Sequence, residues 1–375
     1  MRASATVWRR LDDLRPMSAP ADKTSLEPED PPRAPRRRRL IQVLLAVAAL
    51  VLLALGGATG LVLERQRAYD RNIQRIPGAF PAEAGRPARA PGHAENWLLI
   101  GSDRRTDQAS STGRDGDQPL WRPGAQRADT IMLVHLPADH RRAYLVSFPR
   151  DAWVPIQGHG NAKLNAALSL GGPPLLIATV ERLTGVHVDH FAILDFEGFQ
   201  SMTDALGGVE VRVARTVTDP ARHVVWAAGT HHLDGARALD FVRQRHNLPG
   251  GDLGRIRRQQ AFLKALAGQV VATGTLANPL KLNAFLEAST KAVSVDESLT
   301  ISRLRSMALQ FRSVRASDVA FVTAPIAGTG AEGRQSVVYL DHVKGQRLYR
   351  ALRTDTVEGY LTGGGGTVNQ VDQVR

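Results

Sequence analysis

A run of 24 residues without a formal charge, from residue 40 to residue 63, constrains this chain of 375 residues more than any other feature. The run is rich in Leu, Val and Ala, and a helix needs about 20 apolar residues to cross a bilayer core. It begins far from the N-terminus and is longer than the apolar part of a cleaved signal peptide. Arginines occupy positions 36–39 directly before it, and such charges stay on the cytoplasmic side. We therefore expect one uncleaved membrane-spanning helix, a cytoplasmic N-terminus and an extracytoplasmic remainder.

The chain is strongly basic, with a formal net charge of +12 and an isoelectric point near 10.7. A polyanionic partner is therefore expected, and nucleic acid, an anionic lipid head group and a phosphorylated glycan all fit the charge. The expected topology argues against nucleic acid as the partner, because an exported domain rarely meets chromosomal DNA. The sequence contains no cysteine, which excludes disulfides, thiolate nucleophiles and cysteine-based zinc sites.

Composition divides the chain into segments of different character. Pro-, Gly- and charge-rich stretches lack the periodic apolar pattern of a folded core, whereas the central region has enough apolar residues for one sizeable domain. We expect a disordered cytoplasmic tail at 1–39, the membrane helix at 40–63, a Pro/Ala/Gly-rich stem at 64–92, an extracytoplasmic domain at 93–355 and a flexible tail at 356–375.

Short apolar runs alternate with helical patterns inside the expected domain. The runs are bounded by turn residues, as is typical of strands buried on both faces of a sheet. Strands are expected at 96–101, 130–136, 143–148, 190–196 and 209–213. Helices are expected at 161–172, 173–185, 197–208 and 254–272, the last of them with arginines on the face opposite to its apolar residues. This alternation predicts an α/β/α sandwich with a central mixed sheet, to which residues 273–355 add two strands and a helix at an edge.

Charged residues gather where the expected strands end, and α/β sheets bind ligands at such ends. Loops are often charged merely because they are solvated, but four separate segments here combine arginines and aspartates beyond what solubility requires. Within 241–245, Arg243 and Arg245 would project from one face if the segment is extended. The other three segments contribute Asp103, Arg105, Arg127, Asp129 and Arg150.

This combination of side chains suits a diphosphate ligand. The planar guanidinium of arginine pairs bidentately with phosphate oxygens. Carboxylates would repel phosphate unless a hard cation lies between them, and Mg²⁺ is held by one or two carboxylates together with phosphate oxygens. Asp103 and Asp129 are therefore candidate ligands of Mg²⁺, with Mn²⁺ as an alternative. Phosphoryl transfer, which depends on positioning and charge neutralisation, is the chemistry that these residues favour.

Signals for other chemistry are weak. The sequence has no G-x-S-x-G elbow and no P-loop, which argues against a serine hydrolase of that type and against a P-loop NTPase. His231 and His232 are adjacent, but no further ligand set for zinc lies near them in the sequence.

Eight motifs between about residues 96 and 272 occur in the order found in the LytR-CpsA-Psr family, which the chain resembles. The motifs are "NWLLIGSDRR", "RADTIMLVHL", "YLVSFPRD", "KLNAALSLGG", "HFAILDFEGF", "ALGGVEV", "LDGARALDFVRQRH" and "DLGRIRRQQAFLKAL". The resemblance implies a membrane-anchored α/β domain that binds a polyprenyl-diphosphate-linked glycan and encloses an apolar tunnel for the polyprenyl tail. Members transfer the glycan 1-phosphate to a peptidoglycan sugar hydroxyl, which attaches teichoic acid, capsule or arabinogalactan to the wall. The chain departs from many relatives at "GHGNAK" (158–163), a loop in which acceptor or donor preference could reside.

The resemblance also implies roles for single residues. It assigns the metal-associated role to Asp103 and Asp129, and the diphosphate contacts to Arg150, Arg243 and Arg245. The general base stays open, and Asp252 is our choice because a carboxylate near the acceptor hydroxyl can take its proton. Further positions near the pocket are Arg105, Arg127, Lys163, Asn165, Arg255 and Gln259.

Our leading hypothesis is a magnesium-dependent glycan phosphotransferase at the outer membrane surface of a Gram-positive-type cell. Its partners would be a lipid-linked glycan donor, the peptidoglycan acceptor and the membrane, without nucleic acid. One alternative is a pyrophosphatase that hydrolyses the same donor with water as acceptor. The other is a non-catalytic module that binds lipid-linked glycan or has a regulatory role.

Overall fold

The computed structural model describes residues 64, 67–102, 127–245, 247–248, 250–272, 275, 278–310 and 313–374, all of which belong to one unit, Val62–Arg375. The expected cytoplasmic tail at 1–39 and membrane helix at 40–63 lie outside these residues. Among the helices of the described residues, none is both long enough and apolar enough to span a bilayer.

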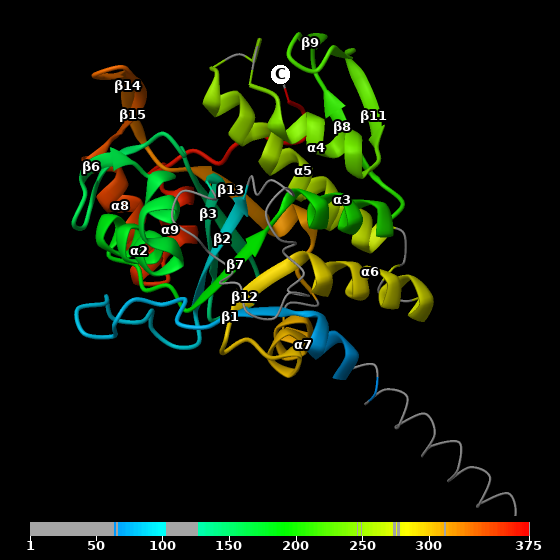
Figure 1. Cartoon of the computed structure of the whole chain (residues 1–375), viewed down its shortest axis with the longest axis horizontal. Coiled ribbons are helices and arrows are strands. Elements are labelled where there is room, and N and C mark those ends of the chain that lie inside the picture. Colours follow the sequence, from blue (N-terminus) through cyan, green and yellow to red (C-terminus); the bar gives the residue numbers. More distant parts are fainter. Residues whose placement is uncertain are drawn as a thin grey trace, which may run out of the picture. The chain divides into compact units, whose positions relative to one another are not determined.

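Seven strands form one mixed sheet through the middle of the domain (Figure 1). Three neighbouring pairs are parallel, namely β1 with β12, β2 with β7 and β4 with β13, and the others are antiparallel. This arrangement confirms the expected central mixed sheet. From edge to edge the strands are β1 (Gln74–Ile76), β12 (Val293–Asp296), β7 (His190–Leu194), β2 (Glu95–Ser102), β3 (Ala128–Leu136), β4 (Ala143–Phe148) and β13 (Val319–Thr323).

Helices cover both faces of the sheet, because successive strand residues point to opposite sides. In β3, Ile131 and Leu133 pack into one core, and Met132 packs into the other. The first core is closed by α2 (Ala166–Thr184), α8 (His342–Arg353) and α9 (Val357–Thr362). The second is closed by α4 (Gly235–Arg243), α5 (Asp252–Ala272) and the paired strands β8 (Val209–Val213) and β11 (Gly229–Leu233). Next to α4 lies α3 (Phe196–Ala205), which packs on α6 (Pro279–Ala292), and α7 (Ile301–Gln310) adjoins a smaller third core.

Three further hairpins stand apart from the main sheet. They are formed by β5 (Trp153–Ile156) with β6 (Gly160–Lys163), β9 (Val217–Asp219) with β10 (Val224–Trp226), and β14 (Ile326–Glu332) with β15 (Gln335–Leu340). A short 3-10 helix, η1 (Ala316–Asp318), precedes β13. The sequence therefore predicted the sheet strand β13 and helix α8 of region 273–355, whereas β14 and β15 form a separate ribbon.

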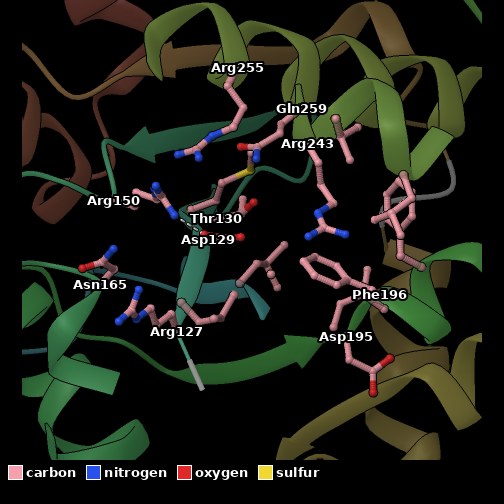
Figure 2. Close-up of a pocket in the computed structure, with 18 of the residues that line it drawn as sticks. Arg127, Asp129, Thr130, Arg150, Asn165, Asp195, Phe196, Arg243, Arg255 and Gln259 are labelled. Carbon is pink, nitrogen blue, oxygen red and sulfur yellow. Dashed lines mark hydrogen bonds and ion pairs between the residues drawn. The ribbon is translucent and has the colours of Figure 1, made fainter. Parts of the chain in front are cut away.

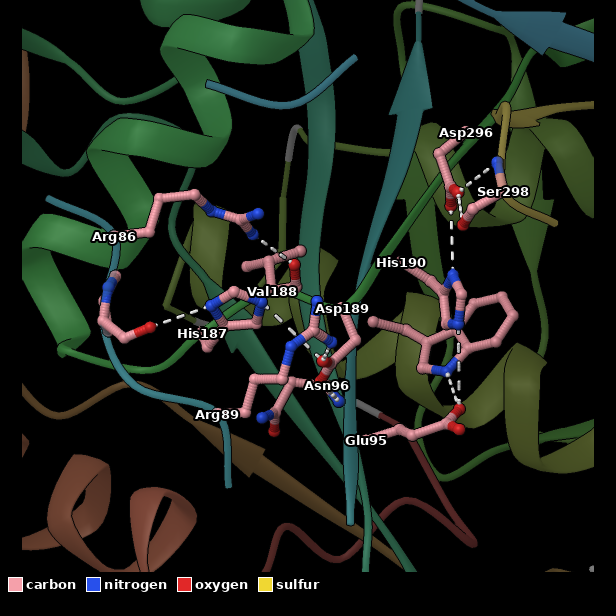
Figure 3. Close-up of polar contacts among 12 residues, drawn as sticks. Arg86, Arg89, Glu95, Asn96, His187, Val188, Asp189, His190, Asp296 and Ser298 are labelled. Carbon is pink, nitrogen blue, oxygen red and sulfur yellow. Dashed lines mark hydrogen bonds and ion pairs between the residues drawn. The ribbon is translucent and has the colours of Figure 1, made fainter. Parts of the chain in front are cut away.

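Residues 67–92 are part of the fold and do not form the separate stem that their composition suggested. β1 is an edge strand of the main sheet, and Ile73 and Ile76 are buried. Arg86 forms a buried ion pair of 2.8 Å with Glu181 of α2. Arg86 also donates to the Val188 carbonyl at 2.6 Å, a contact that Figure 3 shows. These contacts tie the segment to the domain by long-range interactions that local composition does not reveal.

A second polar group holds strand β7 in place. It surrounds His190 and Asp296, which Figure 3 labels. Asp296, at the end of β12, is fully buried and accepts from the Phe191 backbone at 3.0 Å. The His190 ring lies 3.3 Å from the same Asp296 oxygen, and Ser298 also donates to Asp296. Asp296 thereby links two neighbouring strands through both backbone and side-chain contacts.

The C-terminal segment is also packed, contrary to the flexible tail expected at 356–375. After α9, Val371 and Val374 are buried in the second core. The backbone of Val374 exchanges hydrogen bonds with the β8 region, donating to Arg212 at 3.0 Å and accepting from Ala214 at 2.8 Å. The Gly-rich sequence hid this order, because two valines near the end of the chain are enough to anchor the segment once β8 is in place.

Two local predictions need correction. The expected helix at 161–172 begins only at residue 166, because residues 160–163 form β6, and the two expected helices join into α2 with a kink at Gly171 and Gly172. Residues 241–243 are not extended but form the last turn of α4, which ends at Arg243. The argument that Arg243 and Arg245 share a strand face is therefore wrong, although both reach the same cavity.

Candidate functional site

A cavity of about 1010 Å³ opens at one end of the central strands, where β2, β4 and β7 end and β3 begins (Figure 2). The strand register brings these ends together. Gly101 of β2 pairs with Thr130 on one side and with Leu194 on the other, and Ile131 pairs with Phe148. A side chain at Gly101 would put its Cβ 3.0 Å from the Thr130 side chain, so the close approach at this wall favours glycine.

Asp129 lies at the centre of the polar part of this cavity. It is the second residue of β3, and its Oδ1 accepts from Arg150, which follows β4. Arg245 reaches the same oxygen at 3.1 Å from the segment after α4. One carboxylate thus holds two guanidinium groups that come from segments nearly 100 residues apart, and both line the cavity.

Asp151 extends this network toward the β5–β6 hairpin. Its carboxylate lies 3.6 Å from Arg150 Nε and 3.1 Å from Lys163 Nζ. Asn165 is buried beside them, and its backbone N–H donates to the Arg150 carbonyl at 3.0 Å. The two acids and three basic groups alternate in space, which fixes the direction of Arg150 and Lys163 before any ligand arrives.

Arg255 enters from α5 as a buried cation. Its side chain is 3% exposed and forms an ion pair with Asp252 one turn earlier on the helix. Within the described part of the chain, no hydrogen-bond partner reaches Arg255 Nε or Nη1. Burial lowers the pKa of Arg255 to about 10, against the opposing effect of Asp252. A guanidinium that is still charged at neutral pH, buried and short of acceptors is suited to an anionic ligand.

Asp252 adjoins the cavity without lining it. Its Oδ1 lies 4.0 Å from Arg150 Nε, and burial raises the pKa of its carboxyl above the ordinary value although Arg255 acts in the opposite direction. A carboxylate with a raised pKa can accept a proton near neutral pH more readily than an exposed one. This property fits the predicted general base, whose role stays a prediction.

Arg243 marks the border between the polar and the apolar parts of the cavity. Its guanidinium lies over the Phe196 ring, with Cζ 4.2 Å from the ring centre, and Figure 2 shows the two side chains facing each other. Beyond Phe196 the lining is mostly apolar. This apolar part includes Leu99, Met132, Ala192, Leu194, Phe199, Met202, Leu239, Val242, Phe262, Leu263 and Val293.

Most residues predicted from the sequence meet at this cavity. Those that line it are Arg127, Asp129, Arg150, Lys163, Asn165, Arg243, Arg245, Arg255 and Gln259. Asp103 and Arg105 lie outside the described residues. The remaining arginines of the α5 motif differ in position, because Arg257 is exposed and Arg258 is fully buried, with Cζ 4.5 Å from the Phe241 ring centre. The expected arginine face of α5 therefore does not exist as a single surface.

The sequence reasoning missed three polar or aromatic residues of the site. Asp151 stands directly after Arg150, and this adjacency to a predicted residue was a usable signal. Arg222, from the turn between β9 and β10, lines the cavity and pairs with Asp219 at 3.0 Å and Asp240 at 3.2 Å. Neither Arg222 nor Phe196 carries a local signal for this place, because tertiary packing alone brings them there.

Asp129 also fits the predicted cation site as far as the described residues reach. Both guanidinium contacts go to Oδ1, and the cavity that it lines is rich in arginines for phosphate oxygens. Mg²⁺ typically takes one or two carboxylates plus substrate oxygens, so a single described carboxylate is compatible with it. Among the described residues, no cluster of three or more His, Asp or Glu side chains could hold a metal by itself.

Known proteins match this chain in sequence and in structure. The model of the LytR_cpsA_psr family matches residues 71–353. The cell wall biosynthesis protein LcpA of Corynebacterium glutamicum is 34% identical over 366 residues, which covers 89% of this chain and 68% of LcpA.

Two solved structures share the fold. The LytR-Csp2A-Psr enzyme from Actinomyces oris superposes with a TM-score of 0.56 at 22% identity, over 75% of this chain and 97% of that one. TagT bound to LI-WTA superposes with a TM-score of 0.56 at 23% identity, over 74% and 99%. The family match over most of the chain and the similarity to LcpA identify the protein as a member of the LytR-CpsA-Psr family of cell wall biosynthesis proteins.

Proposed function

We propose that this protein transfers a glycan 1-phosphate from a polyprenyl-diphosphate donor to a sugar hydroxyl of peptidoglycan. One observation carries the proposal: a single cavity combines a cluster of arginines around Asp129 with a long apolar lining beyond Phe196. A ligand that fills both parts must have an anionic head and an apolar tail. A lipid-linked glycan diphosphate has this composition.

The head-group contacts follow from the ion pairs of the site. Arg150, Arg245 and Arg255 converge from three segments, and each guanidinium can pair bidentately with phosphate oxygens. Their acidic partners are Asp129, Asp151 and Asp252, so a diphosphate would take over part of these contacts. Arg243 would contact the phosphate from the side of the apolar lining.

In the proposed step, the acceptor hydroxyl oxygen attacks the phosphorus that carries the glycan. A new O–P bond forms, the bridging P–O bond to the lipid phosphate breaks, and polyprenyl phosphate leaves with the bonding electron pair. Asp252 takes the hydroxyl proton, which its raised pKa favours. The arginines stabilise the negative charge that spreads over the phosphoryl oxygens in the transition state.

Mg²⁺ belongs to the proposal as the cation between carboxylate and phosphate. Asp129 would hold the Mg²⁺ ion together with Asp103, the other carboxylate that the sequence predicts as a ligand. Mn²⁺ could replace Mg²⁺. When bound, the cation would neutralise phosphate charge. Titration of the protein with Mn²⁺, read by paramagnetic broadening of a donor analogue, tests this part without an activity assay. Loss of broadening in Asp129→Asn is expected, and equal broadening in that variant would remove Asp129 from the cation site.

The relatives support the choice of cargo and location. LcpA is a cell wall biosynthesis protein, and TagT has been solved bound to LI-WTA, so a wall glycopolymer is the class of glycan that we propose. The apolar run at 40–63 would anchor the chain in the cell membrane with the domain outside. In this proposal, the domain meets both donor and acceptor on that side.

The deciding experiment uses the full chain in nanodiscs with a synthetic polyprenyl-diphosphate oligosaccharide, Mg²⁺ and peptidoglycan fragments, and reads products by mass spectrometry. A glycan-phosphate adduct on the acceptor, absent with EDTA and with Arg150→Ala, is the expected result. The exposed Arg257→Ala on α5 is the matched control and should retain the adduct.

The same experiment separates the alternatives. Release of polyprenyl phosphate at the same rate without acceptor would establish a pyrophosphatase instead. Donor binding without turnover under any acceptor condition would establish a binding or regulatory module and contradict the transferase.

A further inference from the structure

The β14–β15 hairpin is docked beside the proposed donor site, and only its residue Gln335 is part of the cavity lining. Val338 of β15 donates its N–H to the Asp151 carbonyl at 2.9 Å, and Val338 bridges Ala152 in a parallel sense. Asp151 and Ala152 directly follow Arg150 in sequence, and Figure 1 shows the β14–β15 hairpin next to β6. At its tip, Gln335 lines the cavity itself. The hairpin therefore extends the polar mouth of the cavity outward.

Backbone geometry decides which side chains the two hairpins present. Ala152 and Val338 are buried, and successive residues of an extended strand point to opposite sides. Because Ala152 and Val338 are partners in a parallel bridge, the next residues, Trp153 and Tyr339, share the other side. Both are partly exposed, although Val337, on the same side as Tyr339, is buried. Trp153 is paired with Lys163 across the β5–β6 hairpin, so their side chains lie on the same side. Because Lys163 lines the cavity, this side of the hairpin reaches the site. We call this surface, formed by Trp153, Lys163, Glu332, Gln335 and Tyr339, the ledge.

The register of β14 and β15 completes the ledge. Glu332 pairs directly with Gln335, and two positions farther along Gly330 pairs with Val337. The Tyr339 ring lies over Gly330, where a side chain would put its Cβ 2.6 Å from the ring, and the Tyr339 hydroxyl donates to Glu332 at 2.7 Å. The ring is thus held in one orientation by a glycine beneath it and a carboxylate at its edge.

These residue types are those that recognise sugars. The C–H face of a pyranose ring packs on an aromatic ring, while carboxylate and amide groups hydrogen-bond to hydroxyl and N-acetyl groups. The ledge has two aromatic rings, a carboxylate, an amide and an ammonium group, and it leads into the cavity mouth. The apolar part of the cavity lies on the far side of the arginines and is suited to a lipid, so a second polar ligand must approach from elsewhere.

We propose that the ledge binds the acceptor, a chain of N-acetylated pyranoses, and presents its hydroxyl to the cavity beside Arg150. This inference rests on the proposed transferase function and adds to it the place of the acceptor. It also gives a role to the loop 158–163, because that loop is the turn and second strand of the β5–β6 hairpin. His159 at its exposed tip is positioned to vary acceptor preference without touching the arginines.

The test measures acceptor binding without chemistry. Chitotetraose, a chain of N-acetylglucosamine, is titrated into the full chain in nanodiscs and followed by saturation-transfer NMR. Wild type should bind, and Tyr339→Leu and Trp153→Leu should each weaken binding about tenfold, the size expected when an aromatic anchor is removed. Tyr69→Leu, beside β1 at the opposite edge of the sheet, is the matched control and should change binding less than about twofold.

Kinetics with donor give a second readout. Tyr339→Leu should raise the acceptor KM about tenfold and leave the donor KM unchanged, because Tyr339 belongs to the ledge and does not line the donor cavity. Absence of chitotetraose binding to wild type, or equal binding by wild type and the ledge variants, would overturn the ledge. Donor binding to the arginines is measured separately by ³¹P NMR, so its failure would contradict the proposed function and not the ledge.

Discussion

The Arg243 guanidinium lies over the Phe196 ring, with Cζ 4.2 Å from the ring centre. Arg243 is the last residue of α4 and Phe196 the first of α3, so two helix ends define the border between the arginine cluster and the apolar lining. A stacked guanidinium is held flat and presents its edge to a ligand. The border is therefore where a diphosphate head would meet its lipid tail.

Replacing Arg243 by lysine tests this border. The charge remains, but the planar stack on Phe196 is lost, and a lysine ammonium cannot pair bidentately. We expect affinity for a prenyl diphosphate to fall about tenfold in Arg243→Lys, measured by ³¹P NMR or calorimetry. Arg237→Lys, on the same helix, is the control and should bind as wild type does. Unchanged affinity in Arg243→Lys would mean that the stack has no part in binding.

Arg255→Gln tests the coupling between Arg255 and Asp252. Arg255 lowers the pKa of Asp252 while burial raises it, so removal of the guanidinium should raise that pKa further. If Asp252 is the base, activity is lost as pH falls through its pKa, and the acidic limb should move to higher pH. A ¹³C NMR titration of the Asp252 carboxyl measures the shift directly. A limb that stays in place while the carboxyl pKa moves would exclude Asp252 as the base.

Asp296→Asn tests the polar link between β7 and β12. Burial acts to raise the pKa of Asp296, but hydrogen bonds from His190, Ser298 and the Phe191 backbone outweigh it and leave the pKa below the ordinary value. A carboxyl with a lowered folded-state pKa stabilises the fold above its unfolded pKa of about 3.9, and this stability is lost as pH falls through the folded value.

We therefore expect Asp296→Asn to lower the free energy of unfolding by about 1–3 kcal/mol at neutral pH and to flatten its dependence on pH below about 4. Urea denaturation at several pH values provides the measurement. The exposed Asp139→Asn serves as the control and should leave the curve unchanged. An identical acid profile for Asp296→Asn and wild type would contradict the assigned role.

Deletion of residues 367–375 tests the packed C-terminal segment. It removes the buried Val371 and Val374, and it also leaves Gln260 without the Asn369 amide, which donates to it at 2.8 Å. We expect a lower melting temperature and faster hydrogen exchange in β8, whose backbone pairs with Val374. If the deletion changes neither the melting temperature nor the exchange in β8, the result would support the flexible tail that composition suggested.

Local sequence patterns determined the strands and helices of the main layers. They also predicted most of the residues that line the cavity. The apolar runs of β2, β3 and β4 were readable because strands buried on both faces need continuous apolar residues. Asp129 and Arg150 were readable because they lie next to these runs, at positions where sheets bind ligands.

Tertiary structure alone decided the rest, because the deciding contacts join residues far apart in sequence. Arg86 and Glu181 fix a Pro-rich segment to the domain, and Val374 fixes a Gly-rich one, although neither segment has a local pattern of order. Arg255 and Arg258 share one helix and one residue type, but packing turns the first to the cavity and the second onto Phe241. Sequence thus determined which elements form and which chemistry they carry, whereas long-range packing determined which charged groups meet.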